Sequence, residues 1–144
     1  MIAVDTNILV YAHRHDSLWF EPARQALLGL VEGSAPWALP WPCVHEFIAI
    51  STNPNIYRPP TALPQALAQI EALLDSPSVM TIGEHSGYWP VLVRILAGAQ
   101  VTGGKVHDAR IAAICLSHGV SELWSADKDF SRFGELKTRN PLVS

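Results

Sequence analysis

Short apolar runs alternate with longer apolar or amphipathic stretches along most of the chain. Four short runs predict β-strands, at residues 2–4, 37–39, 79–82 and 122–125. The longer stretches predict helices at residues 20–31, 43–50, 63–74, 88–96 and 107–117. Because strands alternate with helices, we expect an α/β fold in which helices cover both faces of a parallel central sheet.

Capping residues and helix breakers set the limits of these elements. Asp16 and Ser17 offer an N-terminal cap for the helix at 20–31, and Gly33 ends that helix. The segment 51–64 contains four prolines and is predicted to be irregular. Three glycines predict a loop before the last helix: Gly98, Gly103 and Gly104. The tail from residue 130 is short and basic. Residues 1–144 are expected to form a single domain.

The composition is that of a protein with a compact core. Hydrophobic residues make up 49% of the chain and charged residues 16%, which argues against disorder. No apolar run approaches the ~20 residues of a membrane span, and the N-terminus lacks the pattern of a signal peptide. Cys43 and Cys115 each lie in an apolar helical pattern, so we expect two reduced core residues in a cytoplasmic protein.

The net charge of −3 neither supports nor excludes a nucleic-acid partner. Six of the ten basic residues lie from residue 105 onward. A divalent cation held by the carboxylates discussed below would also change the effective charge from −3 to −1.

Two carboxylates follow predicted strands. Asp5 comes directly after the first strand, and Asp127 comes shortly after the last. If both strands are parallel and central, these side chains meet at the same edge of the sheet, where α/β folds bind ligands. Taken singly, Asp5 is equally explained as a helix cap and Asp127 as a turn residue.

Two further acids lie in predicted helices. Asp108 has the helical spacing to share a face with Ile111, Ala112 and Cys115, so it is expected to point toward the sheet, although an acid in the first turn also stabilises a helix. Glu46 lies in the middle of an apolar helix, where an ionised side chain is rarely buried without a partner. A solvent-facing Glu46 is the alternative.

Together the four acids predict a cation site. Carboxylates packed closely do not all stay ionised unless a cation lies among them. Oxygen ligands favour Mg²⁺ or Mn²⁺ over Zn²⁺, and such an ion can polarise a phosphodiester bond. Asp129 is either a further ligand or the cap of the next turn.

Four sequence blocks, in this order and spacing, resemble the PIN domain and, more narrowly, the VapC toxins of bacterial toxin–antitoxin pairs. They are residues 4–12, Glu46 within its apolar helix, residues 106–113 and residues 125–130. The resemblance runs from residue 2 to about residue 133. It implies an endoribonuclease that needs Mg²⁺ or Mn²⁺, is held inactive by a partner antitoxin, and is usually dimeric.

The resemblance also assigns roles to residues. Asp5 and Asp108 match the principal metal ligands of the family, and Glu46 and Asp127 match its other two acids; we expect Asp127 to join Asp5 and Asp108 at the metal. Three polar residues match supporting positions: Thr6, Asn7 and Ser125. Four basic residues lie close in sequence to the acids and are predicted to contact RNA phosphates: Lys105, Arg110, Lys128 and Arg132.

Two other classes of protein compete with a ribonuclease. A non-catalytic binding module would use the acids to hold a structural cation or a basic partner. A receiver domain or a haloacid-type phosphatase would also carry acids at strand ends. A receiver needs an Asp on a central strand near mid-chain, which residues 79–82 lack. The phosphatase needs an Asp-x-Asp motif near the N-terminus, where this chain has Asp5, Thr6 and Asn7.

Overall fold

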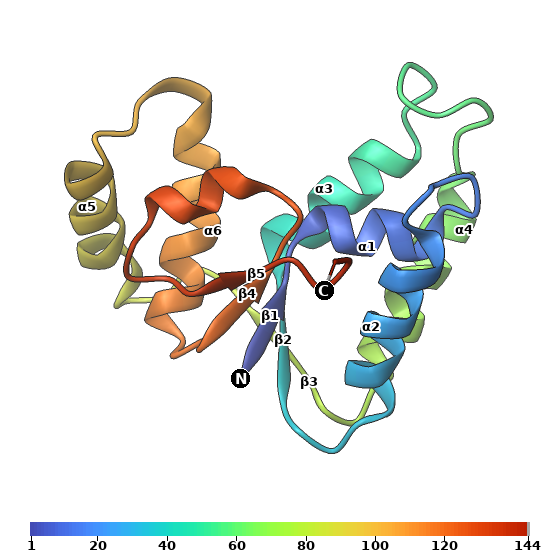
Figure 1. The fold of residues 1–144 in the computed structure, drawn as a ribbon, viewed down its shortest axis with the longest axis horizontal. Coiled ribbons are helices and arrows are strands. Elements are labelled where there is room, and N and C mark those ends of the chain that lie inside the picture. The colour runs from blue at the N-terminus through green and yellow to red at the C-terminus, as the bar shows by residue number, and fades with distance from the viewer. Residues whose placement is uncertain (144) are drawn as a thin grey trace.

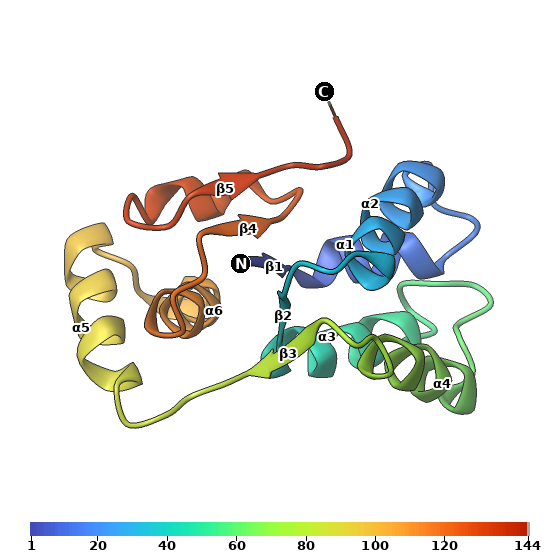
Figure 2. The same ribbon diagram turned by 90° about the horizontal axis from the view of Figure 1, so that it is seen from below.

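A five-stranded, fully parallel sheet forms the centre of the molecule in the computed structural model, which describes residues 1–143 (Figures 1 and 2). The strand order across the sheet is β3-β2-β1-β4-β5. The strands are β1 (Ile2–Val4), β2 (Trp37–Pro40), β3 (Val79–Ile82), β4 (Glu122–Trp124) and β5 (Thr138–Arg139). The predicted parallel α/β fold is therefore confirmed.

Helices flank the sheet on both sides. Helices α5 and α6 pack against each other on one side, and α1 to α4 gather on the other (Figures 1 and 2). The helices are α1 (Thr6–His13), α2 (Phe20–Glu32), α3 (Trp41–Ser51), α4 (Leu63–Leu74), α5 (Tyr88–Ala99) and α6 (Val106–Ser117). Two short 3₁₀ helices precede α6 and follow β4: η1 (Gly103–Lys105) and η2 (Lys128–Arg132). Within residues 1–143, no helix is both long enough and apolar enough to cross a membrane.

Most predicted elements are confirmed, and the differences have local causes. Gly98, predicted in a loop, lies inside α5, which continues to Ala99; a single glycine costs a helix only about 1 kcal/mol, and the packing of Ile95 offsets it. The predicted cap of α2 is wrong. The N-cap residue is Trp19, and no side chain at this position accepts a hydrogen bond from the first turn of the helix. Ser17 accepts instead from the Trp19 amide, and Asp16 pairs with Arg14.

One α-helix and one strand have no counterpart in the sequence-based prediction. Helix α1 begins at once after β1, without an intervening loop. Strand β5 is only two residues long and lies in the basic tail, so it has no apolar pattern. Backbone bonds hold it to β4: the Leu123 amide donates to the Lys137 carbonyl and the Ser125 amide to that of Arg139, each at 2.9 Å.

The order of the strands positions the acidic residues. Strands β1 and β4 are neighbours near the middle of the sheet, and Val4 pairs with Trp124. The Asp5 amide continues this pairing by donating to the Trp124 carbonyl at 2.9 Å. The carboxyl ends of both strands, and the residues that follow them, therefore meet at one edge of the sheet. Cys43 and Cys115 are free thiols buried in the core, as predicted.

Candidate active site

Asp5 anchors a polar network at the edge of the sheet. Its carboxylate is 5% exposed and caps α1 by accepting from the Thr6 amide at 2.8 Å. The second carboxylate oxygen accepts from the Ser125 hydroxyl at 2.6 Å. The Cys43 thiol donates to Asp5 at 3.7 Å. Asp5 is thus both a helix cap and a member of the acidic site, so the two interpretations of this residue do not exclude each other.

Asn7 and Ser125 extend the network from Asp5 toward Asp127. The Asn7 amide donates to Asp5 at 3.3 Å and to the Ser125 hydroxyl at 3.2 Å. The Asn7 carbonyl oxygen accepts from the Ala126 amide at 3.1 Å. The Ser125 hydroxyl in turn accepts from the Asp127 amide at 3.0 Å. These bonds join the start of α1 to the turn after β4.

Burial makes the Asp5 carboxyl a weaker acid than usual. Desolvation raises the pKa of its carboxyl from 3.8 to about 6, and the nearby Glu46 adds to this rise. The hydrogen bonds from Ser125, the Thr6 amide and Cys43 lower the pKa and offset part of the effect. Perturbed acids of this kind are concentrated at functional sites.

Glu46 faces the same site from α3. Its carboxylate accepts from the Thr6 hydroxyl at 2.9 Å, and Thr6 is itself buried in the first turn of α1. The alternative of a fully solvent-facing Glu46 is therefore wrong. Thr6 connects two acids, because its backbone amide binds Asp5 and its hydroxyl binds Glu46.

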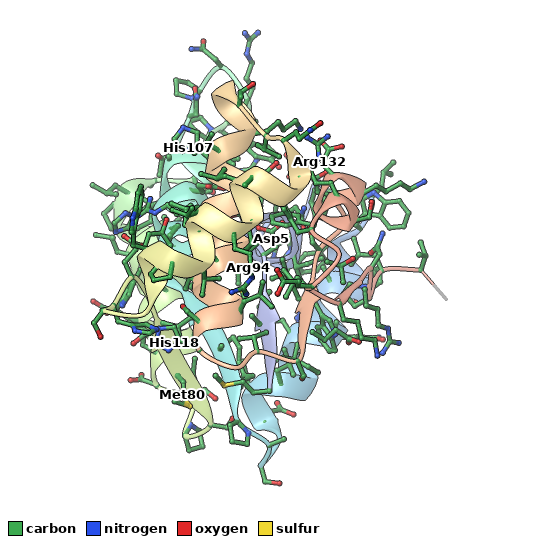
Figure 3. All side chains as sticks on the ribbon, turned by 90° about the vertical axis from the view of Figure 1, so that its left-hand side faces the viewer. Asp5, Met80, Arg94, His107, His118 and Arg132 are labelled. Carbon is green, nitrogen blue, oxygen red and sulfur yellow. The ribbon has the colours of Figure 1, made fainter. Side chains whose placement is uncertain are left out.

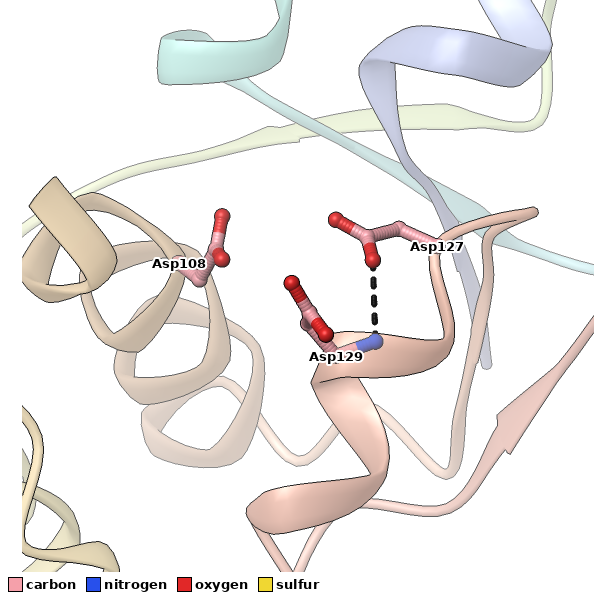
Figure 4. A group of neighbouring side chains, drawn as sticks. All are labelled: Asp108, Asp127 and Asp129. Atoms are coloured by element: carbon pink, nitrogen blue, oxygen red, sulfur yellow. Dashed lines mark hydrogen bonds between the residues drawn. The ribbon is translucent and has the colours of Figure 1, made fainter.

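Three aspartates form the tightest group of acids. Asp108, Asp127 and Asp129 each offer a carboxylate oxygen, and these oxygens all lie within 4.8 Å of one another. Figure 4 shows Asp108 reaching from α6 toward the other two, which belong to the turn at η2. Asp127 also accepts from the Asp129 amide at 2.8 Å and so caps η2. The cap of this turn is therefore Asp127, and Asp129 stands with the candidate ligands.

Like charges crowd this group. Desolvation raises the pKa of Asp108, and the charges of Asp127, Asp129 and Glu46 raise it further. The Lys105 ammonium opposes this effect: it pairs with Asp129 and lies 3.9 Å from Asp108. A lysine side chain thus already partly neutralises the acids.

One cavity of about 250 Å³ contains the predicted acids. Its lining includes Asp5, Glu46, Asp108 and Asp127, together with Thr6 and Asn7. The closest trio nevertheless differs from the expected ligand set, because Asp129 takes the place of Asp5. Both Asp5 oxygens accept protein hydrogen bonds. Ser125 does not line the cavity, but its hydroxyl donates a hydrogen bond to the Asp5 carboxylate.

The four predicted RNA contacts fall into two pairs. Lys105 is bound to Asp129, and Arg110 makes a two-point ion pair with Glu84 at 3.0 and 3.2 Å. Lys128 and Arg132 are exposed on η2, and within residues 1–143 neither forms an ion pair. Arg132 is exposed and Asp5 is buried; both are labelled in Figure 3. Lys128 and Arg132 are therefore the freer of the four.

Sequence reasoning missed several residues that contact the site, among them Cys43 and Tyr57. Cys43 was expected only to fill the core, yet it binds Asp5. Tyr57 lines the acidic cavity from the loop between α3 and α4. No sequence signal marked Tyr57, because the proline-rich segment around it has no periodicity that assigns a side chain to a face.

Comparison with known proteins places this arrangement in a family. The PIN domain matches residues 2–136. Ribonuclease VapC43 of Mycobacterium tuberculosis is 33% identical over 142 residues, which cover 99% of this chain and 96% of that protein. Ribonuclease VapC48 of the same species is 30% identical over 138 residues, covering 96% and 95%. The chain belongs to the VapC family of PIN-domain ribonucleases.

Solved structures share the VapC fold at lower identity. VapBC2 from Rickettsia felis, bound to a DNA fragment from its promoter, matches with a TM-score of 0.71 and 18% identity over 97% of this chain and 98% of that one. Mycobacterium tuberculosis VapC20, a toxin that cleaves the sarcin–ricin loop, matches with a TM-score of 0.62 and 16% identity over 91% and 93%. Membership of the VapC family removes the receiver and phosphatase alternatives.

Proposed function

We propose that this VapC-family chain is a Mg²⁺- or Mn²⁺-dependent endoribonuclease and the toxin of a toxin–antitoxin pair. One observation carries the proposal: three aspartate oxygens lie within 4.8 Å of one another in a chain whose relatives are ribonucleases. Asp108 and Asp127, from this trio, share a cavity with Asp5 and Glu46.

The donor set fits a hard divalent cation. All the candidate ligands are carboxylates. Burial, and then the charges of neighbouring acids, raise the pKa of Asp108, and a cation would relieve the repulsion among these charges. Asp108 and Asp127 would hold the ion, with Asp129 or Asp5 completing its protein ligands. When bound, such an ion polarises the phosphodiester and stabilises the charge that develops during its hydrolysis.

The chain's own side chains give this site its shape. Ser125 and Asn7 fix the carboxylate of Asp5, and Thr6 fixes that of Glu46. These bonds hold two acids in place before any substrate arrives, which reduces the reorganisation needed during the reaction. Lys128 and Arg132 extend from η2 beside Asp127 and Asp129 and would contact phosphates flanking the cleaved bond.

The test is cleavage of total RNA with Mg²⁺, with Mn²⁺ and with chelator, followed by mapping of the new RNA ends. The wild type should cut at defined sites only with metal, and Asp108→Asn should lose the activity. Asp75→Asn is the matched control, because Asp75 is exposed at the end of α4. A protein that binds Mn²⁺ but leaves RNA intact would instead be the binding module.

We also propose an antitoxin partner and a homodimer, as the family resemblance implies. The Rickettsia felis neighbour is a VapBC2 assembly, so a chain of this fold occurs with a partner. We propose that the protein acts in the cytoplasm, where cysteines stay reduced, because its two cysteines are free and buried. Co-expression with a candidate antitoxin, followed by light scattering of the purified complex, tests both the partner and the stoichiometry.

A further inference from the structure

The acidic cavity has a second wall that the proposed metal site does not use. Besides the acids, its lining contains Val10, Tyr11, Ile50 and Tyr57. These side chains come from α1, α3 and the loop that follows α3. One open cavity therefore combines carboxylates suited to a cation with an apolar, aromatic surface suited to a flat ring.

Arg14 holds Tyr57 in a fixed position. The Arg14 guanidinium carbon lies 4.3 Å from the centre of the Tyr57 ring, which is the geometry of a cation–π contact. Arg14 also donates to the Pro59 carbonyl at 2.9 Å and to the Thr61 hydroxyl at 3.2 Å, and it pairs with Asp16 at 2.7 Å. The loop that carries Tyr57 is thus tied to the end of α1.

The cavity borders a part of Tyr57 that Arg14 does not cover. Arg14 lies over the ring but is absent from the cavity lining, whereas Tyr57 belongs to it. Within residues 1–143, neither the Tyr57 nor the Tyr11 hydroxyl forms a hydrogen bond. Tyr57 is half-buried, and the part of its side chain that lines the cavity is open to a ligand.

A nucleobase is the ligand that matches this wall. Proteins recognise single-stranded RNA by stacking unpaired bases on aromatic side chains. The cavity of about 250 Å³ is smaller than the roughly 300–1,000 Å³ that drug-sized ligands occupy, so it suits one ring system. Because the acids line the same cavity, one nucleotide could place its phosphate at a cation held by the acids and its base at Tyr57.

We propose that Tyr57, with Tyr11 beside it, forms a stacking site for the nucleobase next to the cleaved phosphate. Tyr57 then contributes to the choice of cleavage position. This inference rests on the proposed ribonuclease function. Removing one stacked base from an aromatic side chain weakens binding by about 5- to 150-fold, and the same loss is expected here.

The first experiment compares tyrosine variants on a random-sequence 12-nucleotide RNA with Mn²⁺, with the cleavage ends sequenced. Tyr57→Leu should flatten the base preference next to the cut and raise KM by about 5- to 150-fold, with a smaller change in kcat. Tyr57→Phe keeps the ring and should behave as wild type. Tyr88→Leu is the control, because Tyr88 is the third tyrosine and does not line the cavity. An unchanged preference and KM in Tyr57→Leu would overturn the proposal.

The second experiment changes the RNA and separates this proposal from the proposed function. Wild-type protein is titrated in chelator with a fluorescent 12-nucleotide single-stranded RNA, and with versions that carry one abasic residue at each position in turn. One abasic position should weaken binding by about 5- to 150-fold, and that difference should vanish in Tyr57→Leu. If RNA is bound in this way but never cut, the ribonuclease proposal fails and the stacking site stands. Equal binding of all versions refutes the stacking site, whatever the cleavage assay gives.

Discussion

Replacing Asp5 by Asn should stabilise the metal-free protein at neutral pH, although it removes a buried acid from the centre of the site. The carboxyl is 5% exposed, and burial raises its pKa from 3.8 to about 6. Ionising this group in the folded protein therefore takes more free energy than ionising it in the unfolded chain. Asn is neutral at every pH and avoids that cost.

The magnitude follows from the difference between the two pKa values. At about 1.4 kcal/mol per pKa unit, a rise from 3.8 to about 6 lowers the unfolding free energy of the wild type by about 3 kcal/mol at pH 7. Below about pH 3 the group is protonated in both states and the penalty is absent; it grows as the pH rises from about 3 to 6. Asn keeps the bond from the Thr6 amide, but its NH₂ group replaces the oxygen that accepts from Ser125 and Asn7, at a cost of about 1 kcal/mol for each bond. The net gain at pH 7 is about 1 kcal/mol.

The assay is urea unfolding in chelator at several pH values between 4 and 8. Asp5→Asn should be less stable than wild type at pH 4 and more stable at pH 7. Asp75→Asn, a change of the same type at an exposed position, should follow the wild type throughout. If the difference between Asp5→Asn and wild type does not change across this pH range, burial is not what sets the acidity of Asp5.

Three further predictions concern charges around the site. Without metal, Asp108→Asn should be as stable as wild type or more stable. At a hundredfold excess over Kd, Mn²⁺ should raise the unfolding free energy of wild type by roughly 2.7 kcal/mol and that of the variant by much less. Melting curves with chelator and with Mn²⁺ measure both effects, and an undiminished gain in the variant would rule Asp108 out as a ligand. Lys105→Ala should lower the Kd for Mn²⁺ several-fold in calorimetry, because it removes a like charge that pairs with the acids; weaker Mn²⁺ binding would mean that Lys105 supports the site. The double variant Lys128→Ala with Arg132→Ala should weaken RNA binding and reduce its slope against log salt by about 1.4, whereas Lys137→Ala should not; an unchanged slope would remove Lys128 and Arg132 from the RNA surface.

The sequence predicts the acidic site better than the finer arrangement of its ligands. Asp5 and Asp127 follow strands, and parallel strands place such residues at one edge of a sheet. Glu46 and Asp108 stand out as charges on apolar helix faces. These local patterns suffice to place all four in one cavity.

What the sequence leaves open depends on contacts between distant segments. Lys105 meets Asp129 only because η1 and η2 approach each other in the fold. The hydrogen bonds that hold the Asp5 carboxylate join residues up to 120 positions apart. Strand β5 exists through backbone pairing with β4 and not through its side chains, so no pattern of apolar residues predicts it.

The most direct test of a carboxylate site that hydrolyses RNA is the chemistry of the product ends. A single mapped RNA substrate is cut with Mg²⁺ or Mn²⁺, and the fragments are end-labelled with and without prior phosphatase treatment. Attack by water at phosphorus predicts 5′-phosphate and 3′-hydroxyl ends, and no cleavage in chelator. Fragments with 2′,3′-cyclic phosphate ends that persist in chelator would mean that the ribose 2′-hydroxyl is the nucleophile, and would contradict the account.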